Sequence, residues 1–113
     1  MNWTHEKAVC LCKKIETVCV PFGCHVALTG GCLYKEGERK DCDVLFYRIR
    51  QIAKIDIEGL VKALADNGIN LVSGFGWCLK FVFDGMNIDA FFPEEEGGNY
   101  DQGNDNAGIL EVI

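Results

Sequence analysis

The sequence lacks the features that mark membrane, secreted and disordered proteins. Its longest apolar runs are only a handful of residues, too short for a helix that crosses a membrane. Residues 1–6 contain no basic stretch followed by an apolar core, so no secretory signal is expected. Hydrophobic residues make up 49% of the 113 positions, which is too many for a disordered chain. These absences predict one soluble globular domain with no membrane partner.

Paired cysteine motifs are absent as well. The chain has 7 cysteines and 2 histidines, but no two cysteines have the CxxC spacing. Structural zinc sites usually contain such short pairs, so a zinc-binding cysteine protein is only a minor alternative. Most of the cysteines lie beside Val, Leu or Ile, which favours buried, reduced thiols. Reduced thiols in turn favour a reducing compartment, so we expect a cytoplasmic protein.

Basic residues are missing from the end of the chain, after Lys80. The net charge of −6 argues against a broad grip on a nucleic-acid backbone, which needs a basic surface. Lys and Arg cluster instead between Lys35 and Lys54, where they could hold the phosphates of a small ligand. Residues 94–113 are acidic and rich in Gly and Asn. We therefore expect one domain at 1–93 and an acidic tail at 94–113, in which 109–113 could add a short strand.

Two amphipathic helices and five apolar strands are predicted from the spacing of the hydrophobic residues. The helices cover 4–22 and 56–67, where apolar residues recur every three to four positions. The strands cover 25–29, 41–49, 69–72, 77–83 and 88–92, and a loop or short hairpin covers 33–40. This order predicts an α/β (α+β) domain, in which a small mixed or antiparallel sheet carries its helices on one face.

Three carboxylates lie on the predicted strands. Asp41 and Asp43 are two residues apart on one strand, so their side chains share a face. Two carboxylates so close repel each other unless a cation neutralises them, which indicates a divalent metal. Asp89 is the lone acid on an otherwise apolar strand, where a charge is costly unless something binds it. We therefore expect Asp41, Asp43 and Asp89 to converge as a metal-binding cluster.

A glycine pair, Gly30 and Gly31, ends the strand that precedes these aspartates. Without side chains, a backbone can approach a phosphate closely. A strand that ends in Gly-Gly, an Asp-x-Asp about ten residues later and a third Asp on a later strand resemble the nucleotidyltransferase superfamily, with its polymerase-beta-like palm. The motifs here are Val26-Ala27-Leu28-Thr29-Gly30-Gly31, Asp41-Cys42-Asp43-Val44-Leu45 and Ile88-Asp89-Ala90-Phe91. The resemblance covers roughly residues 5–93.

The resemblance implies transfer of a nucleoside monophosphate from a nucleoside triphosphate, such as ATP, onto a hydroxyl. It implies that Asp41 and Asp43 bind two Mg²⁺ (or Mn²⁺) ions and that Asp89 holds the one that activates the acceptor. It also implies that Gly30, Gly31 and Cys32 cradle the phosphates. Among the nearby cations, Lys35, Arg39 or Lys40 could add positive charge there.

Other interpretations stay open at this stage. The resemblance covers no helical domain that would read the base, so it implies a minimal form completed by a partner chain or a homodimer. A catalytically inactive binding or regulatory module on the same fold is the main alternative. The acceptor could be a protein, a nucleic acid or a small molecule. His25 is expected to be a structural residue rather than a base, and Phe75 and Trp77 are expected to be core aromatics.

Overall fold

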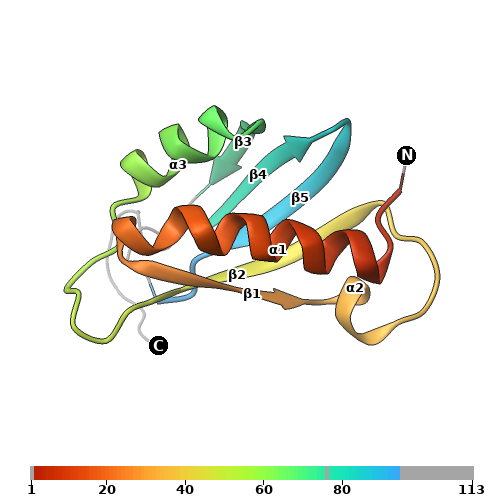
Figure 1. Ribbon diagram of the computed structural model, residues 1–113, viewed down its shortest axis with the longest axis horizontal. Coiled ribbons are helices and arrows are strands. Elements are labelled where there is room, and N and C mark those ends of the chain that lie inside the picture. The colour runs from red at the N-terminus through yellow and green to blue at the C-terminus, as the bar shows by residue number, and fades with distance from the viewer. Residues whose placement is uncertain (1, 76, 95–113) are drawn as a thin grey trace.

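The computed structural model describes residues 2–75 and 77–94, so all of the expected acidic tail after its first residue, Glu94, and its final strand lie outside the described part. Figure 1 shows how the elements of the chain are arranged. In chain order they are α1 (His5–Cys19), the 3-10 turn η1 (Val20–Phe22), β1 (Cys24–Thr29), α2 (Gly31–Tyr34), β2 (Asp41–Arg48), α3 (Ile57–Asp66), β3 (Ile69–Phe75), β4 (Cys78–Phe83) and β5 (Met86–Phe91).

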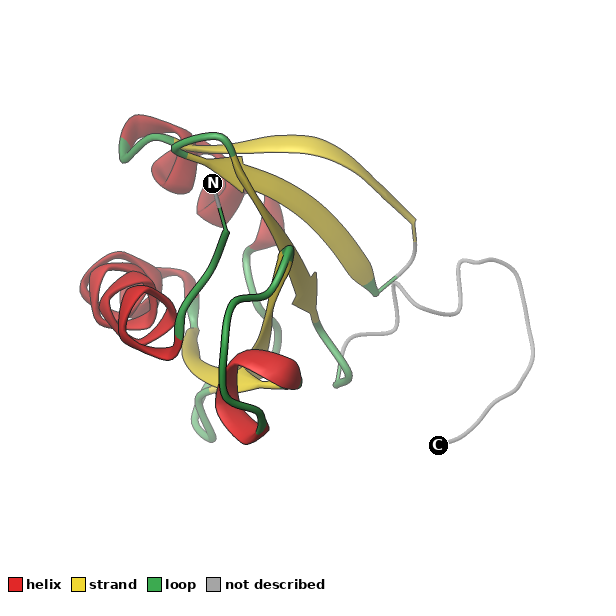
Figure 2. Ribbon diagram, turned by 90° about the vertical axis from the view of Figure 1, so that its right-hand side faces the viewer, coloured by secondary structure: helices red, strands yellow, loops and turns green. Residues whose placement is uncertain are grey.

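The strands form one mixed sheet in the order β1-β2-β5-β4-β3. β2 and β5 run parallel at its centre, and every other neighbouring pair is antiparallel. Figure 2 shows α1 and α3 together on one side of the curved sheet. This architecture confirms the predicted fold class, a mixed sheet with its helices on one face. The helices leave the opposite sheet face without a helical cover (Figure 2).

The two long helices start and end where the sequence supplies caps. Thr4 Oγ1 accepts a hydrogen bond from the Lys7 amide at the start of α1. Asp56 Oδ1 does the same for the Gly59 amide at the start of α3. Each cap satisfies an amide that has no partner inside its own helix, typically stabilising the helix by about 1 kcal/mol. α1 ends through the 3-10 turn, after which Gly23 takes a φ of +94°.

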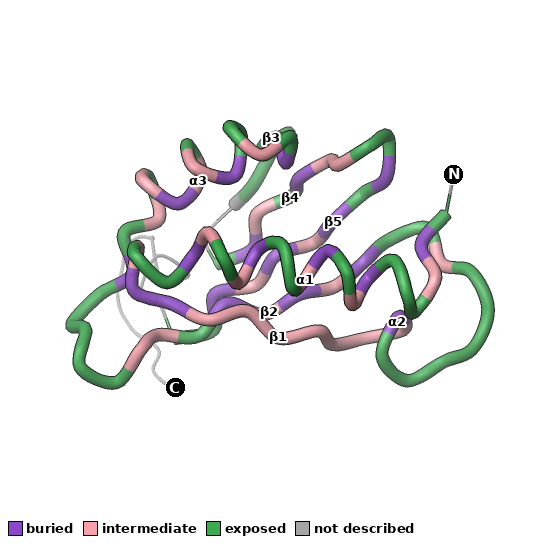
Figure 3. The backbone as a smooth tube through the Cα atoms, viewed as in Figure 1, coloured by how far each residue is buried: buried purple, intermediate pink, exposed green. Residues whose placement is uncertain are grey.

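The core lies between the helices and the inner face of the sheet (Figure 3). Cys42, Val44 and Phe46 of β2 are buried there, which confirms the predicted alternation along this strand. Phe46 stacks on Phe92 with ring centroids 5.0 Å apart. Burial of each such large side chain contributes about 1.5–3 kcal/mol to folding. Cys19, Cys24, Cys32, Cys42 and Cys78 are buried, as expected for most of the cysteines.

Three details differ from the sequence-based expectations. The segment 33–40 was predicted as a loop or hairpin, but its first two residues belong to α2, where the Leu33 and Tyr34 amides both donate to the Gly30 carbonyl. β3 continues to position 75, because Ser73 and Gly74 still pair with Lys80 and Leu79 of β4 after a shift of register that follows Leu71. Trp77 is not a core residue, because 45% of it is exposed. The side chain of Phe75 lies outside the described part.

Candidate functional site

A row of polar side chains crosses the open face of the sheet. Asp43 of β2 has Thr29 of β1 and Asp89 of β5 as its Cα partners. Asp89 in turn pairs with Lys80 of β4. Directly opposed residues on neighbouring strands project from the same face. The four residues Thr29, Asp43, Asp89 and Lys80, here called the acidic row, therefore lie side by side on the face that the helices leave open.

The sheet brings the three predicted aspartates to this one face. Asp43 and Asp89 are direct register partners, and Asp41 lies two residues before Asp43, opposite Asn87. Burial raises the pKa of the Asp43 carboxyl, and the charges of Asp89 and then Asp41 raise it further. The three groups therefore interact electrostatically. Within residues 2–75 and 77–94, no three His, Cys, Asp or Glu side chains are gathered closely enough to form a ready-made metal cluster.

Lys80 is the member of the row that the sequence reasoning missed. Its Nζ donates a hydrogen bond to Asp89 Oδ1 at 2.8 Å. The Asp89 side chain is only 20% exposed, whereas that of Lys80 is 47% exposed. The hydrogen bond and the charge of Asp89 raise the pKa of Lys80. One signal was available, because Lys80 is the only charged residue within the predicted strand 77–83.

Gly30 brings the backbone at the end of β1 directly against the Asp43 carboxylate. Its φ of +70° and ψ of −154° belong to a region that side chains strongly disfavour. A Cβ at this position would also overlap Asp43 Oδ2. Only glycine both adopts this backbone conformation and leaves room for the Asp43 carboxylate. Gly30 therefore helps to set the position of that carboxylate. Gly31 then begins α2.

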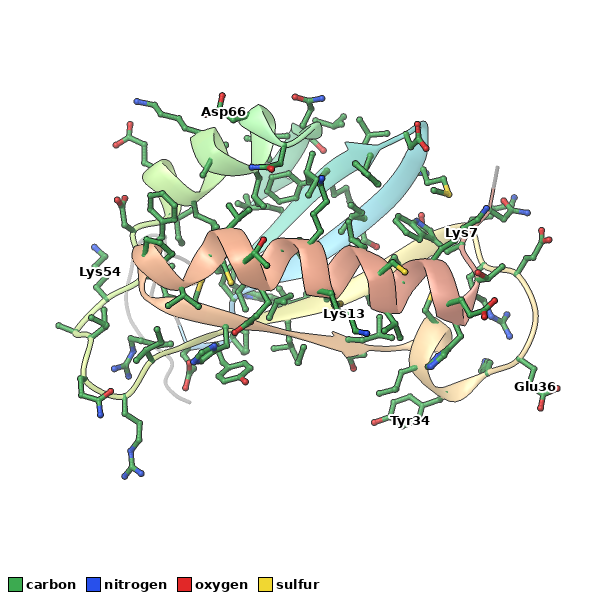
Figure 4. The ribbon with its side chains drawn as sticks, in the orientation of Figure 1. Lys7, Lys13, Tyr34, Glu36, Lys54 and Asp66 are labelled. Carbon is green, nitrogen blue, oxygen red and sulfur yellow. The ribbon has the colours of Figure 1, made fainter. Side chains whose placement is uncertain are left out.

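The other predicted phosphate-binding residues lie around α2 and the start of β2. Lys35 follows α2 and Lys40 precedes β2, and both are exposed. Cys32 is buried, and its Sγ donates to the Asp41 carbonyl at 3.6 Å, which ties α2 to the first residue of β2. Only the backbone of Cys32 is therefore suited to a ligand. Tyr34 and Glu36 project outward from α2 and the loop after it (Figure 4).

Arg39 links this loop to the N-terminal segment. Its backbone exchanges hydrogen bonds with Trp3, at 2.7 and 2.8 Å. Its side chain packs on Gly31 and donates from Nη2 to the Glu36 carbonyl at 3.2 Å. Arg39 Nε is buried without a hydrogen-bond partner in the described part of the chain. The Arg39 side chain thus packs against the Gly30-Gly31 turn at Gly31.

His25 has a structural partner, as expected. Its Nδ1 lies 2.6 Å from Glu16 Oε2, and the Val26 amide donates to the other carboxylate oxygen of Glu16 at 3.1 Å. Burial of Glu16 acts to raise its pKa, but the hydrogen bonds from His25 and Val26 outweigh this effect and lower it. His25 therefore ties α1 to the edge strand β1 rather than acting in the acidic row.

A cavity of about 350 Å³ lies elsewhere, between α1 and the β4–β5 turn. Its lining includes Trp3, Leu11, Lys14, Phe83 and Met86. Because α1 covers the opposite face of the sheet, this cavity is separate from the acidic row (Figure 2). No helix among the described residues is long and apolar enough to span a membrane.

Comparison with solved structures identifies the fold. The chain superposes on a cytoplasmic RNA terminal U-transferase with a TM-score of 0.63 and 10% sequence identity. The chain has a nucleotidyltransferase-like fold. At this identity the link is distant and concerns the fold alone. The match covers 80% of this chain but only 28% of the U-transferase chain. A scan against protein-family models and a search of curated proteins each give no match.

Proposed function

We propose that the protein is a metal-dependent nucleotidyltransferase that moves a nucleoside monophosphate from a nucleoside triphosphate onto a hydroxyl. One observation carries this proposal. Asp43 and Asp89 are register partners on the open sheet face, and Gly30 lies directly against Asp43. The nucleotidyltransferase-like fold supports the same function. ATP is one candidate donor, and the cytoplasm is the compartment that the cysteine content favours.

The donor set at this site fits Mg²⁺ or Mn²⁺. Asp41, Asp43 and Asp89 offer carboxylate oxygens, the ligands that these hard cations prefer. The raised pKa of Asp43, caused by burial and by its two neighbouring carboxylates, indicates negative charge that a cation would stabilise. The three aspartates would hold the ion. When bound, it would neutralise phosphate charge and lower the pKa of the attacking hydroxyl.

Backbone and side-chain groups of this chain would bind the phosphates and accept the proton of the acceptor. The Gly30-Gly31 backbone, the Cys32 amide, Lys35 after α2 and Lys40 before β2 would hold the phosphates. Asp89 Oδ would accept the proton of the acceptor hydroxyl as its oxygen attacks the α-phosphorus. The new oxygen–phosphorus bond forms while the bond to the bridging oxygen breaks, and pyrophosphate leaves.

A second candidate function has an observation of its own. Lys80 already neutralises Asp89. This ion pair favours a binding or regulatory module on the same fold, which would act through a partner chain or as a homodimer. Such a module would bind a nucleotide or a partner without turnover.

Thermal unfolding with each nucleoside triphosphate, with and without Mg²⁺ or Mn²⁺, tests the proposal. We expect at least one nucleotide to raise the melting temperature only when metal is present. A ligand at 100 times its Kd stabilises the folded state by about 2.7 kcal/mol. Asp41→Asn/Asp43→Asn should abolish this shift, whereas Asp66→Asn, at the exposed end of α3, should keep it. A shift that persists in the double mutant would place nucleotide binding elsewhere.

A further inference from the structure

An apolar row runs beside the acidic row on the same sheet face. Leu45 follows Asp43 by two residues on β2, and Phe91 follows Asp89 by two residues on β5. Leu45 and Phe91 are register partners, and Phe91 also pairs with Cys78 of β4. Side chains two apart on a strand share a face, with about 7 Å between their Cα atoms. The apolar row therefore lies two residues farther along β2 and β5 than the carboxylates.

Trp77 extends this apolar row at its exposed end. Its ring lies against that of Phe91, with centroids 5.9 Å apart and planes tilted by 36°. The Trp77 carbonyl accepts a hydrogen bond from the Phe92 amide at 2.8 Å, which fixes the backbone beneath the ring. Cys78, the neighbouring residue, is only 6% exposed, although Trp77 is 45% exposed. Trp77, Phe91 and Leu45 together form what we call the aromatic shelf.

The shelf and the glycine turn lie on opposite sides of the acidic row. Asp41, the first residue of β2, adjoins α2 through the Cys32 contact, and Lys40 directly precedes it. In the other direction along β2, the residue that follows Asp43 on this face is Leu45. If the phosphates of the donor lie at the glycine turn, the shelf lies on the other side of the acidic row from them, where a second substrate would be beside Asp89. This placement rests on the proposed function.

We propose that the aromatic shelf binds a flat ring of the acceptor, so that the acceptor is a nucleoside or a similar ring-bearing alcohol. Stacked on Trp77 and Phe91, such a ring would hold its attached hydroxyl about two residues back along β5, beside Asp89. The net charge of −6 disfavours a long polyanion, and the cation of the adjoining acidic row, Lys80, is already paired with Asp89. A short, weakly charged acceptor suits this surface.

Tryptophan fluorescence offers a direct test, because the chain has 2 tryptophans and Trp3 is only 1% exposed. Uridine, which carries a ring and hydroxyls, is titrated into the full chain without metal or triphosphate, with excitation where uridine does not absorb. We expect saturable quenching of Trp77 that ribose does not cause and that free N-acetyltryptophanamide does not show. Trp77→Leu should lose the response. Phe91→Ala should raise the uridine concentration at half-saturation by about three- to tenfold.

Matched variants separate this inference from the proposed function. Val72→Ala, which trims another exposed apolar side chain on β3, should keep the uridine response. Asp43→Asn should also keep it while losing the metal-dependent nucleotide shift. A uridine response without any nucleotide shift would retain the shelf and overturn the proposed function. Linear quenching equal to that of free tryptophan, or an equal response to ribose, would overturn the shelf.

The donor nucleotide provides the sharpest alternative. If a nucleoside triphosphate with Mg²⁺ quenches Trp77 and uridine competes with it, the shelf holds the base of the donor and the inference is wrong. We expect instead that saturating triphosphate leaves the uridine response in place. The quenching is measured in the unaltered protein, so this outcome does not depend on whether a shelf variant folds.

Discussion

Lys80 Nζ donates a hydrogen bond to Asp89 Oδ1 at 2.8 Å, and the two residues are register partners on β4 and β5. Lys80 thus supplies part of the positive charge that the acidic row requires while no metal is bound. A metal ion that uses Asp89 as a ligand has to compete with this ammonium group. The ion pair therefore opposes metal binding at the third carboxylate.

Removal of the Lys80 charge should strengthen metal binding. We expect Lys80→Met to tighten Mn²⁺ binding by up to about fivefold, because the ammonium group no longer competes with the metal for the Asp89 carboxylate. Titration with Mn²⁺, followed by electron paramagnetic resonance of the free ion, measures this change. Lys62→Met, on the exposed side of α3, is the control and should bind Mn²⁺ like the unaltered chain. Weaker binding in Lys80→Met would contradict the competition between lysine and metal.

Substitution of Gly30 should disturb both the backbone and the Asp43 carboxylate. Gly30→Ala is expected to destabilise the fold by roughly 1–3 kcal/mol from backbone strain and also to push Asp43 aside, because its Cβ overlaps Oδ2. Gly37→Ala is the matched control, since Gly37 also has a positive φ of 90° but no atom within 4 Å of an added Cβ. Only Gly30→Ala should lose metal-dependent nucleotide binding. Chemical denaturation and nucleotide titration distinguish the two effects.

The pKa of Asp43 predicts how stability depends on pH in the metal-free protein. Burial and the charges of Asp89 and Asp41 raise this pKa above its ordinary value of 3.8. The folded state then binds a proton more tightly than the unfolded state, so the contribution of Asp43 to stability falls as pH rises from 3.8 through the folded value. Asp43→Asn should therefore melt at a higher temperature than the unaltered chain at pH 7. In a melting series at decreasing pH, the difference in melting temperature between Asp43→Asn and the unaltered chain should shrink. A difference that grew towards acid pH would contradict the raised pKa of Asp43.

His25 should matter for stability but not for turnover. His25→Gln removes its contact with Glu16, a half-exposed pair that is worth no more than about 1 kcal/mol. The pKa of Glu16, lowered by its hydrogen bonds against the effect of burial, means that this contact stabilises above pH 4.5 and is lost as pH falls through the folded value. Nucleotide binding by His25→Gln should be unchanged at pH 7. A loss of binding with an unchanged melting temperature would reassign His25 to the site.

Hydrophobic periodicity predicted most of the fold, because the same residues that repeat along the chain form its core. Ala8, Leu11 and Ile15 of α1 recur at helical spacing and are buried. Cys42, Val44 and Phe46 alternate along β2 and face the helices. The parallel pairing of β2 with β5 could not be read from local pattern, since it joins segments more than forty residues apart.

The details that sequence reasoning missed depend on neighbours from other strands. Trp77 reads as a core aromatic, but its position just before β4 leaves it at the exposed end of the apolar row. Lys80 was given no role from the sequence, because only the pairing of β4 with β5 places it opposite Asp89. Asp41 and Asp43 could be singled out because Asp-x-Asp and the glycine pair before it are local motifs, and Asp89 because it is the lone acid on an apolar strand. Their side-by-side arrangement is a property of the sheet.

Paramagnetic broadening by Mn²⁺ with a bound nucleoside triphosphate tests the central claim most directly, because it locates the metal on the sheet. In a two-dimensional amide spectrum of the full chain, the signals of Gly30, Gly31, Asp41, Asp43 and Asp89 should broaden first. Signals from α3, on the opposite face, should be among the last to broaden. Asp43→Asn should restore the broadened signals. Broadening centred on any other segment, or none at saturating Mn²⁺ and nucleotide, would contradict a metal–nucleotide site at the acidic row.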